Sequence, residues 1–116
     1  MDRDLLPLFE RVETALADTE REYALLPFFV RGIVRRGFAR RIGKDFAGWR
    51  ALLADARDGR QRSVVADALG ALAEHFRGAP LRARRGRGAT PAQLAIIEER
   101  SLARADAASA LRAALS

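Results

Sequence analysis

The chain has 116 residues, a length that suits one domain, and its formal net charge at pH 7 is +6. It contains no cysteine, which excludes disulfides and thiolate chemistry, and its single histidine leaves little for a histidine-based metal site. Hydrophobic residues make up 49% of the chain and charged residues 31%, a balance typical of a globular protein. The N-terminus does not resemble a signal peptide and no apolar run reaches the length of a membrane span, so we expect a cytoplasmic protein without a transmembrane segment.

Apolar residues recur at helical spacing along almost the whole chain, beginning with a first helix at about residues 4–26. One face of this helix is apolar and the other is acidic, and Pro27 is expected to end or kink it. The next region carries a stripe that runs from Val34 to Leu53, but Phe28, Phe29 and Ile33 point away from that stripe if the helix is continuous. We therefore predict a break near Gly32 or Gly37, between a short helix at 28–36 and a longer one at 38–57.

The C-terminal half predicts two further helices separated by a basic segment. A helix beginning near Ser63 is expected to end at Gly78-Ala79-Pro80, and residues 79–89 then form an exposed linker rich in arginine and glycine. Thr90, Pro91 and Gln93 have the spacing of a capping box with proline in the first turn, so a last helix starts there. Its apolar stripe is weak and built of small residues, so it either docks on the bundle or packs against another subunit.

These elements predict an all-α fold, a compact bundle of four to five helices with a C-terminal helix that follows an Arg/Gly-rich linker. Residues 1–78 are assigned to the helical bundle, 79–89 to the linker and 90–116 to the C-terminal helix, within a single domain overall.

The sequence offers little for catalysis. His75 is expected to be a surface histidine or to cap the C-terminal end of its helix, and the few serines have no evident base. Carboxylate pairs such as Glu10 and Glu13 are most simply read as a solvated helix face. We expect no enzyme activity, no metal and no cofactor.

The positive charge is concentrated in two blocks that contain no acidic residue. Residues 28–44 carry six Lys and Arg, and residues 77–90 carry five Arg. Such a concentration predicts a surface that meets an anionic partner, and DNA or RNA bound through its phosphates is the leading hypothesis, with this chain as an accessory subunit of a nucleoprotein complex. The candidate contacts are Arg36, Arg40, Arg41 and Lys44 on a helix, and Arg82, Arg84, Arg85 and Arg87 on the linker, where glycine would let an arginine arm approach a minor groove. The linker block is favoured, because the acidic first helix can partly neutralise the other block.

Three alternatives stay open. The basic blocks can meet acidic protein surfaces, with the chain as a structural or adaptor protein in a phage particle or another oligomeric complex, and a homo-oligomer is possible. They can also be solvated faces that aid solubility. Residues 28–53 combine aromatic side chains with arginines, as interfacial membrane helices do, although a bundle of this size needs the same aromatics in its core.

Overall fold

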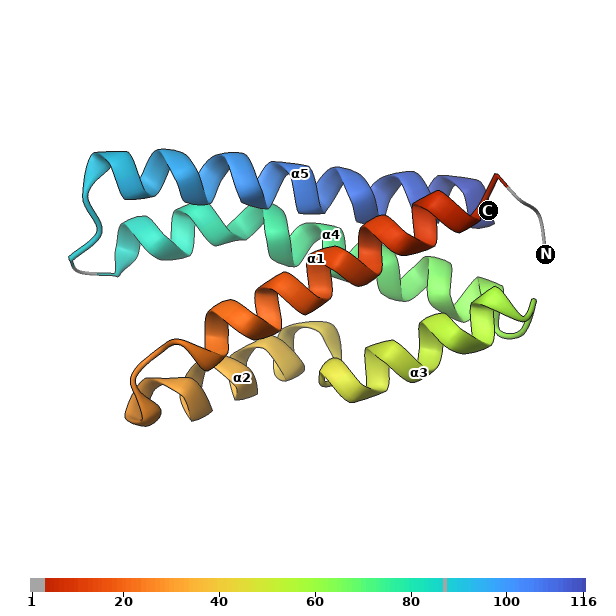
Figure 1. Cartoon of the computed structure of the whole chain (residues 1–116), viewed down its shortest axis with the longest axis horizontal. Helices are drawn as coiled ribbons and strands as arrows, with labels where there is room; N and C mark the ends of the chain where they lie inside the picture. The colour runs from red at the N-terminus through yellow and green to blue at the C-terminus, as the bar shows by residue number, and fades with distance from the viewer. Residues whose placement is uncertain (1–3, 87) are drawn as a thin grey trace.

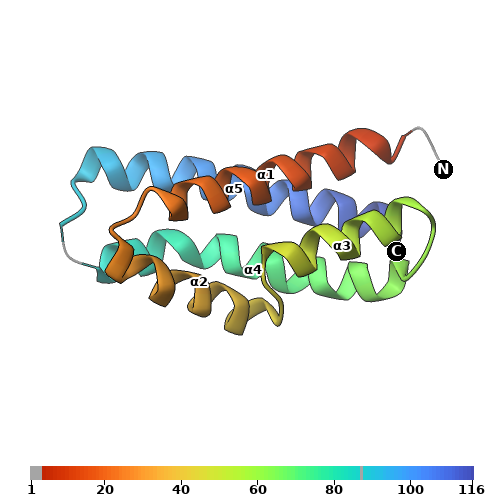
Figure 2. The same cartoon turned by 60° about the horizontal axis from the view of Figure 1, so that its bottom comes forward.

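The computed structural model of the chain is an all-α bundle, described here for residues 4–86 and 88–116. Its helices are α1 (Leu6–Ala24), α2 (Phe28–Ile42), α3 (Phe46–Arg57), α4 (Arg62–Arg85) and α5 (Pro91–Leu115). Helices α2 and α3 follow one another along the bundle, so the five helices make four antiparallel rods (Figure 1). Figure 2 shows the bend between α2 and α3, with α4 beside both. The all-α bundle predicted from the sequence is confirmed.

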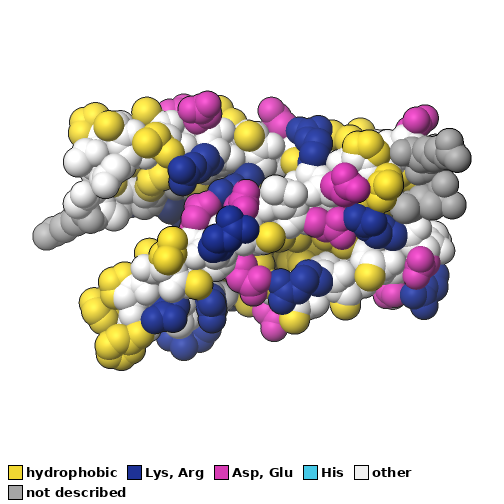
Figure 3. All heavy atoms as spheres, viewed as in Figure 1, with side chains coloured by type: hydrophobic (Ala, Val, Ile, Leu, Met, Phe, Trp, Pro, Cys, Tyr) yellow, Lys and Arg dark blue, Asp and Glu magenta, His cyan; other side chains and the backbone are white. Residues whose placement is uncertain are grey.

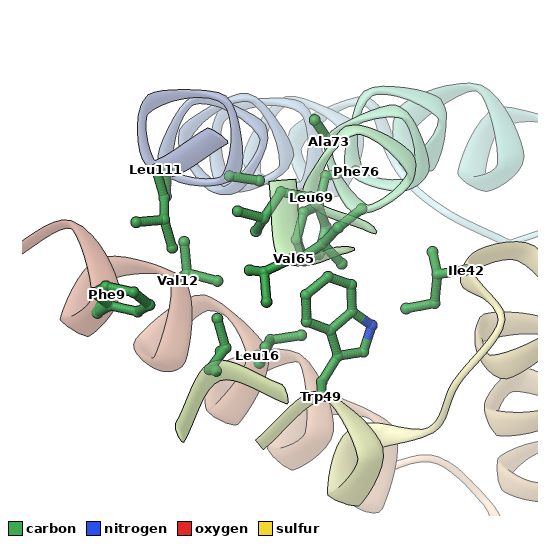
Figure 4. Close-up of a cluster of buried hydrophobic side chains, with 14 of the residues drawn as sticks. Phe9, Val12, Leu16, Ile42, Trp49, Val65, Leu69, Ala73, Phe76 and Leu111 are labelled. Carbon is green, nitrogen blue, oxygen red and sulfur yellow. The ribbon is translucent and has the colours of Figure 1, made fainter. Parts of the chain in front are cut away.

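One core runs the length of the bundle and takes side chains from every helix. Phe9, Val12 and Leu16 of α1 and Trp49 of α3 line one side of this core, and Val65 and Leu69 of α4 and Leu111 of α5 line the other (Figure 4). The solvent reaches none of the surface of Trp49. Toward α2 the core becomes aromatic: the Phe38 ring stacks on the Phe46 ring at 4.3 Å between centroids, and Tyr23 meets both rings edge-on.

The break in the second region lies at 43–45, so the prediction of a break at Gly32 or Gly37 is wrong. Gly43 ends α2 with a φ of +78°, a backbone conformation that favours glycine, and the Asp45 carboxylate then accepts a hydrogen bond from the Gly48 amide to cap α3. Helix α2 is therefore continuous through both expected break points. Its two sets of apolar residues lie on different faces, and only the set that includes Phe38 and Ile42 enters the core.

Helix α4 continues to Arg85, past the end predicted at 78, with Pro80 inside it. The segment predicted as a linker at 79–89 is thus helical over its first seven residues. The Arg82 side chain folds back along α4 and donates to the carbonyl oxygen of His75 at 2.6 Å, which bridges the turn that contains Pro80. A Cβ atom at Gly78 would lie 2.8 Å from Nη1 of Arg82, so the bare glycine gives that side chain its path.

The last helix docks on its own chain. The capping box at Thr90 and Gln93 is confirmed, and α5 runs antiparallel along α4 (Figure 1). The buried residues of α5 are small, apart from the last of them: Ser101, Ala105, Ala107, Ala108 and Leu111. Small side chains let the two helices approach closely. Helix α5 therefore packs on α4 through close backbone contact and not through large apolar side chains.

Candidate nucleic-acid interface

The basic block of α2 is left without counter-charge. Arg35, Arg36, Arg40 and Arg41 are exposed, while Arg31 and Lys44 are partly buried. Within the described residues, none of these six side chains forms an ion pair with a carboxylate. Lys44 instead places its Nζ over the Trp49 ring, 5.7 Å from the centroid.

The acidic face of α1 pairs with other helices. Glu20 accepts a hydrogen bond from Arg50 of α3 at 2.6 Å, Glu13 pairs with Arg57 of α3, and Glu22 pairs with Arg104 of α5. These carboxylates do not neutralise α2, contrary to what the sequence suggested. The α2 block therefore keeps its positive field at the surface.

The second basic block is the more compensated of the two. Arg77 pairs with Glu74 at 2.6 Å and donates to the Ser109 hydroxyl, and Arg84 lies 3.7 Å from the Glu98 carboxylate. Arg85 is exposed at the end of α4, and Arg87 lies outside the described residues. Because Arg82, Arg84 and Arg85 belong to a helix, they do not form the extended arm predicted for a minor groove.

The two blocks meet at His75. Arg41 donates from Nε to Nδ1 of the imidazole at 3.2 Å, and Nη2 of Arg82 lies 3.4 Å from the same nitrogen. Arginine has no acceptor, so Nδ1 must be the unprotonated nitrogen and the ring proton resides on Nε2. Two guanidinium groups from different helices thus converge on one neutral ring, and neither has a carboxylate partner among the described residues.

His75 is buried and cannot easily carry a charge, which corrects the expectation of a surface histidine. It is 5% exposed and packs edge-on against the Phe38 ring at 5.0 Å. Burial, together with the charges of Arg82 and Arg41, lowers the pKa of His75 from 6.5 to about 3. Burial and Arg41 also lower the pKa of Arg82. The neutral imidazole therefore accepts from Arg41 and does not neutralise the charge of either arginine.

Two other hollows in the structure are less selective for an anion than the site at His75. An open groove of about 870 Å³ between α1 and α5 is lined by acids such as Glu10 and Asp18 as well as by Arg11 and Arg100, so it presents both signs of charge. A smaller pocket of about 170 Å³ lies beside Tyr23, His75 and Ser101, and Arg41 and Arg82 do not line it. Over the part of the chain that is described, no three His, Cys, Asp or Glu side chains gather as metal ligands would.

Comparisons with known proteins add no functional assignment: no protein-family model matches this chain, and neither the curated proteins nor the solved structures contain a significant match.

Proposed function

We propose that this protein is a non-catalytic nucleic-acid-binding protein that holds phosphates with the C-terminal half of α2 and the end of α4. The observation that carries the proposal is the convergence of Arg41 and Arg82 on a neutral histidine with no carboxylate beside them. Guanidinium groups bind phosphate oxygens through two parallel hydrogen bonds, and an anion between the two arginines relieves their mutual repulsion.

The other residues of this surface have graded roles. Arg36 and Arg40 lie one helical turn apart on the exposed side of α2 and extend the positive track along that helix. Lys44 contributes charge from its position over Trp49. Arg85 and Arg84 follow Arg82 at the end of α4, with Arg84 weakened by Glu98. Such contacts give affinity and orientation without reading bases, which suits an accessory subunit of a cytoplasmic nucleoprotein complex.

The salt dependence of binding tests this proposal. The affinity for a fluorescently labelled 20-base-pair DNA duplex, and for its RNA counterpart, is measured by anisotropy over a range of salt concentrations. Four to five phosphate contacts predict that log K falls with log salt with a slope of roughly −4 for the DNA duplex. Absence of binding to either duplex at low salt would contradict the proposal and favour an acidic protein partner for the same arginines.

A matched pair of variants locates the surface. The double substitution Arg41→Gln/Arg82→Gln removes two charges at His75, whereas Arg11→Gln/Arg100→Gln removes two exposed charges from the groove between α1 and α5. Both variants have the same net charge. We expect the first to weaken binding at least tenfold and to flatten the salt slope by about 1, because the two arginines share one phosphate, and the second to change the affinity much less. Equal losses would mean that binding follows net charge and not this surface.

A further inference from the structure

Four large apolar side chains stand exposed where α1 gives way to α2. Leu25, Phe28, Phe29 and Ile33 are 81%, 80%, 68% and 63% exposed, and we call them the apolar tip. The Phe28 and Phe29 rings touch edge-on, with 5.8 Å between centroids. The tip lies at one end of the elongated molecule, where Figure 3 shows hydrophobic side chains gathered at the lower left with Lys and Arg beside them.

The bundle does not need the tip for its own stability. The C-terminal half of α2 supplies Phe38 and Ile42 to the core, while the tip residues, at and just before the start of the helix, are exposed to solvent. Exposed apolar patches that the fold does not require mark surfaces at which another phase or molecule is bound. The position at the end of the long axis allows such a contact without any rearrangement of the helices.

The charge around the tip identifies the kind of surface. The sequence contains no acidic residue from Tyr23 to Lys44. Arg31 lies between Phe29 and Ile33 of the tip, and Arg35 and Arg36 follow Ile33 within one helical turn. None of these three arginines pairs with a carboxylate in the described structure. On its α2 side, the apolar end is followed only by cations, which complements a surface that is apolar inside and anionic outside, the arrangement of a bilayer with acidic lipids.

Other occupants fit less well. A second copy docked symmetrically through the tip would bring Arg35 and Arg36 of both chains together, with no acidic residue to separate them. A nucleic acid would meet the arginines but would leave the aliphatic Leu25 and Ile33 without a partner. None of the helices in residues 4–86 and 88–116 is long and apolar enough to cross a membrane, so the contact we consider is with the bilayer surface.

We propose that the apolar tip inserts into the headgroup and upper acyl region of a bilayer that contains anionic lipid, with Arg35 and Arg36 contacting the lipid phosphates. Long arginine side chains can keep their charge at the headgroups while the rings enter the apolar layer. This surface shares Arg36 with the track proposed for nucleic acid, whereas the phosphate site at Arg41 lies about 18 Å along α2 from Phe29.

Vesicle sedimentation tests the insertion. The protein is mixed with vesicles of phosphatidylcholine, and with vesicles in which about a third of the lipid is phosphatidylglycerol. We expect binding to the anionic vesicles only. Phe28→Ser/Phe29→Ser should lower the partition coefficient at least tenfold, whereas Ile96→Ser/Leu102→Ser, which alters two exposed apolar residues of α5, should leave it within twofold. Arg35→Gln/Arg36→Gln should lower it about thirtyfold on anionic vesicles.

A second readout guards against a misfolded variant. Phe28→Trp places an indole at the exposed tip, in contrast to the buried Trp49. Its emission should shift to shorter wavelength when anionic vesicles are added and should stay constant with phosphatidylcholine alone. The proposal is overturned by failure to bind anionic vesicles, by undiminished binding of Phe28→Ser/Phe29→Ser, by an emission that vesicles do not shift, or by a dimer in solution that Phe28→Ser/Phe29→Ser converts to a monomer.

Discussion

Arg41 and Arg82 belong to different basic blocks of the sequence and to different helices, yet their guanidinium groups approach the same ring nitrogen of His75, at 3.2 and 3.4 Å. This arrangement holds two positive charges close together beside a ring that burial keeps neutral. Repulsion between the two charges opposes folding and is relieved by an anion. Burial, reinforced by these two charges, explains why the histidine resists protonation, and the same two charges are the basis of the proposed phosphate site.

The stability of the protein should depend on pH through His75. Because the pKa of this histidine is lowered from 6.5 in the unfolded chain to about 3 in the folded one, the unfolded state binds more protons between these values. The contribution of a neutral His75 to the free energy of unfolding is complete above pH 6.5. It is lost as the pH falls from 6.5 toward about 3, at about 1.4 kcal/mol per pH unit for a single proton. Urea unfolding at pH 5 and pH 7 measures it, with His75→Asn as the reference. The free energy of unfolding should change less between pH 5 and pH 7 in the variant than in the unmodified protein. An equal change in both proteins would mean that His75 does not cause the pH dependence.

The Gly78→Ala substitution separates the position of Arg82 from global stability. The new Cβ would lie 2.8 Å from Nη1 of Arg82, so the flexible end of that side chain must move away from His75. Alanine is favoured over glycine inside a helix by about 1 kcal/mol, and the free energy of unfolding should stay the same or rise. The pKa of His75, followed by NMR, should rise because a nearby cation has been displaced.

Gly86→Ala is the control for that substitution. At Gly86, where φ is −71°, a Cβ meets only ordinary contacts of 3.5 Å and longer, so Arg82 is not disturbed. The pKa of His75 should not change in this variant. If Gly78→Ala also leaves the pKa unchanged, Arg82 does not contribute to the neutrality of His75.

The close packing of α4 and α5 predicts that a larger apolar residue will destabilise the bundle. Ala105 is 1% exposed on α5, which packs chiefly against α4. Leucine at this position overfills the contact, and Ala105→Leu should lower the free energy of unfolding by about 1–3 kcal/mol. Ala113→Leu makes the same change at an exposed position of α5 and should cost less than about 0.5 kcal/mol. Denaturant unfolding compares the two, and equal stabilities would mean that α5 does not pack on α4 as described.

The sequence predicted the elements better than their relations. The all-α bundle follows from helical spacing, and the start of α5 follows from local hydrogen bonds of Thr90 and Gln93 that any chain context would preserve. The conflict between Phe28, Phe29 and Ile33 and the stripe through Phe38 was visible in the sequence. A break in the helix was predicted to resolve this conflict. In the structure the helix is continuous, and Phe28, Phe29 and Ile33 are exposed. A break would have allowed both sets to be buried, but spacing in the sequence does not distinguish an exposed apolar face from a buried one.

The geometry of the candidate site depends on contacts between helices, which the spacing of apolar residues in the sequence does not predict. The pairing of Glu13, Glu20 and Glu22 with α3 and α5 required the order of helices around the bundle. The burial of His75 required the packing of α2 on α4, because the residues that enclose it, such as Phe38, are remote in sequence. The end of α4 was predicted at residues 78–80 because proline usually ends a helix, but α4 continues through Pro80. The sequence did locate the two basic blocks, and Arg41 and Arg82 were among the residues it selected.

We propose that Arg41 and Arg82 hold one phosphate together, and a double-mutant cycle on the affinity for a labelled duplex distinguishes a shared site from two separate ones. The affinities of the unmodified protein, Arg41→Gln, Arg82→Gln and the double variant are measured at one salt concentration. If the two arginines grip the same anion, each single substitution should lose most of the binding that the pair provides, and the loss in the double variant should be smaller than the two single losses together by about 1 kcal/mol or more. Additive losses, or unchanged affinity in all three variants, would contradict a shared phosphate site.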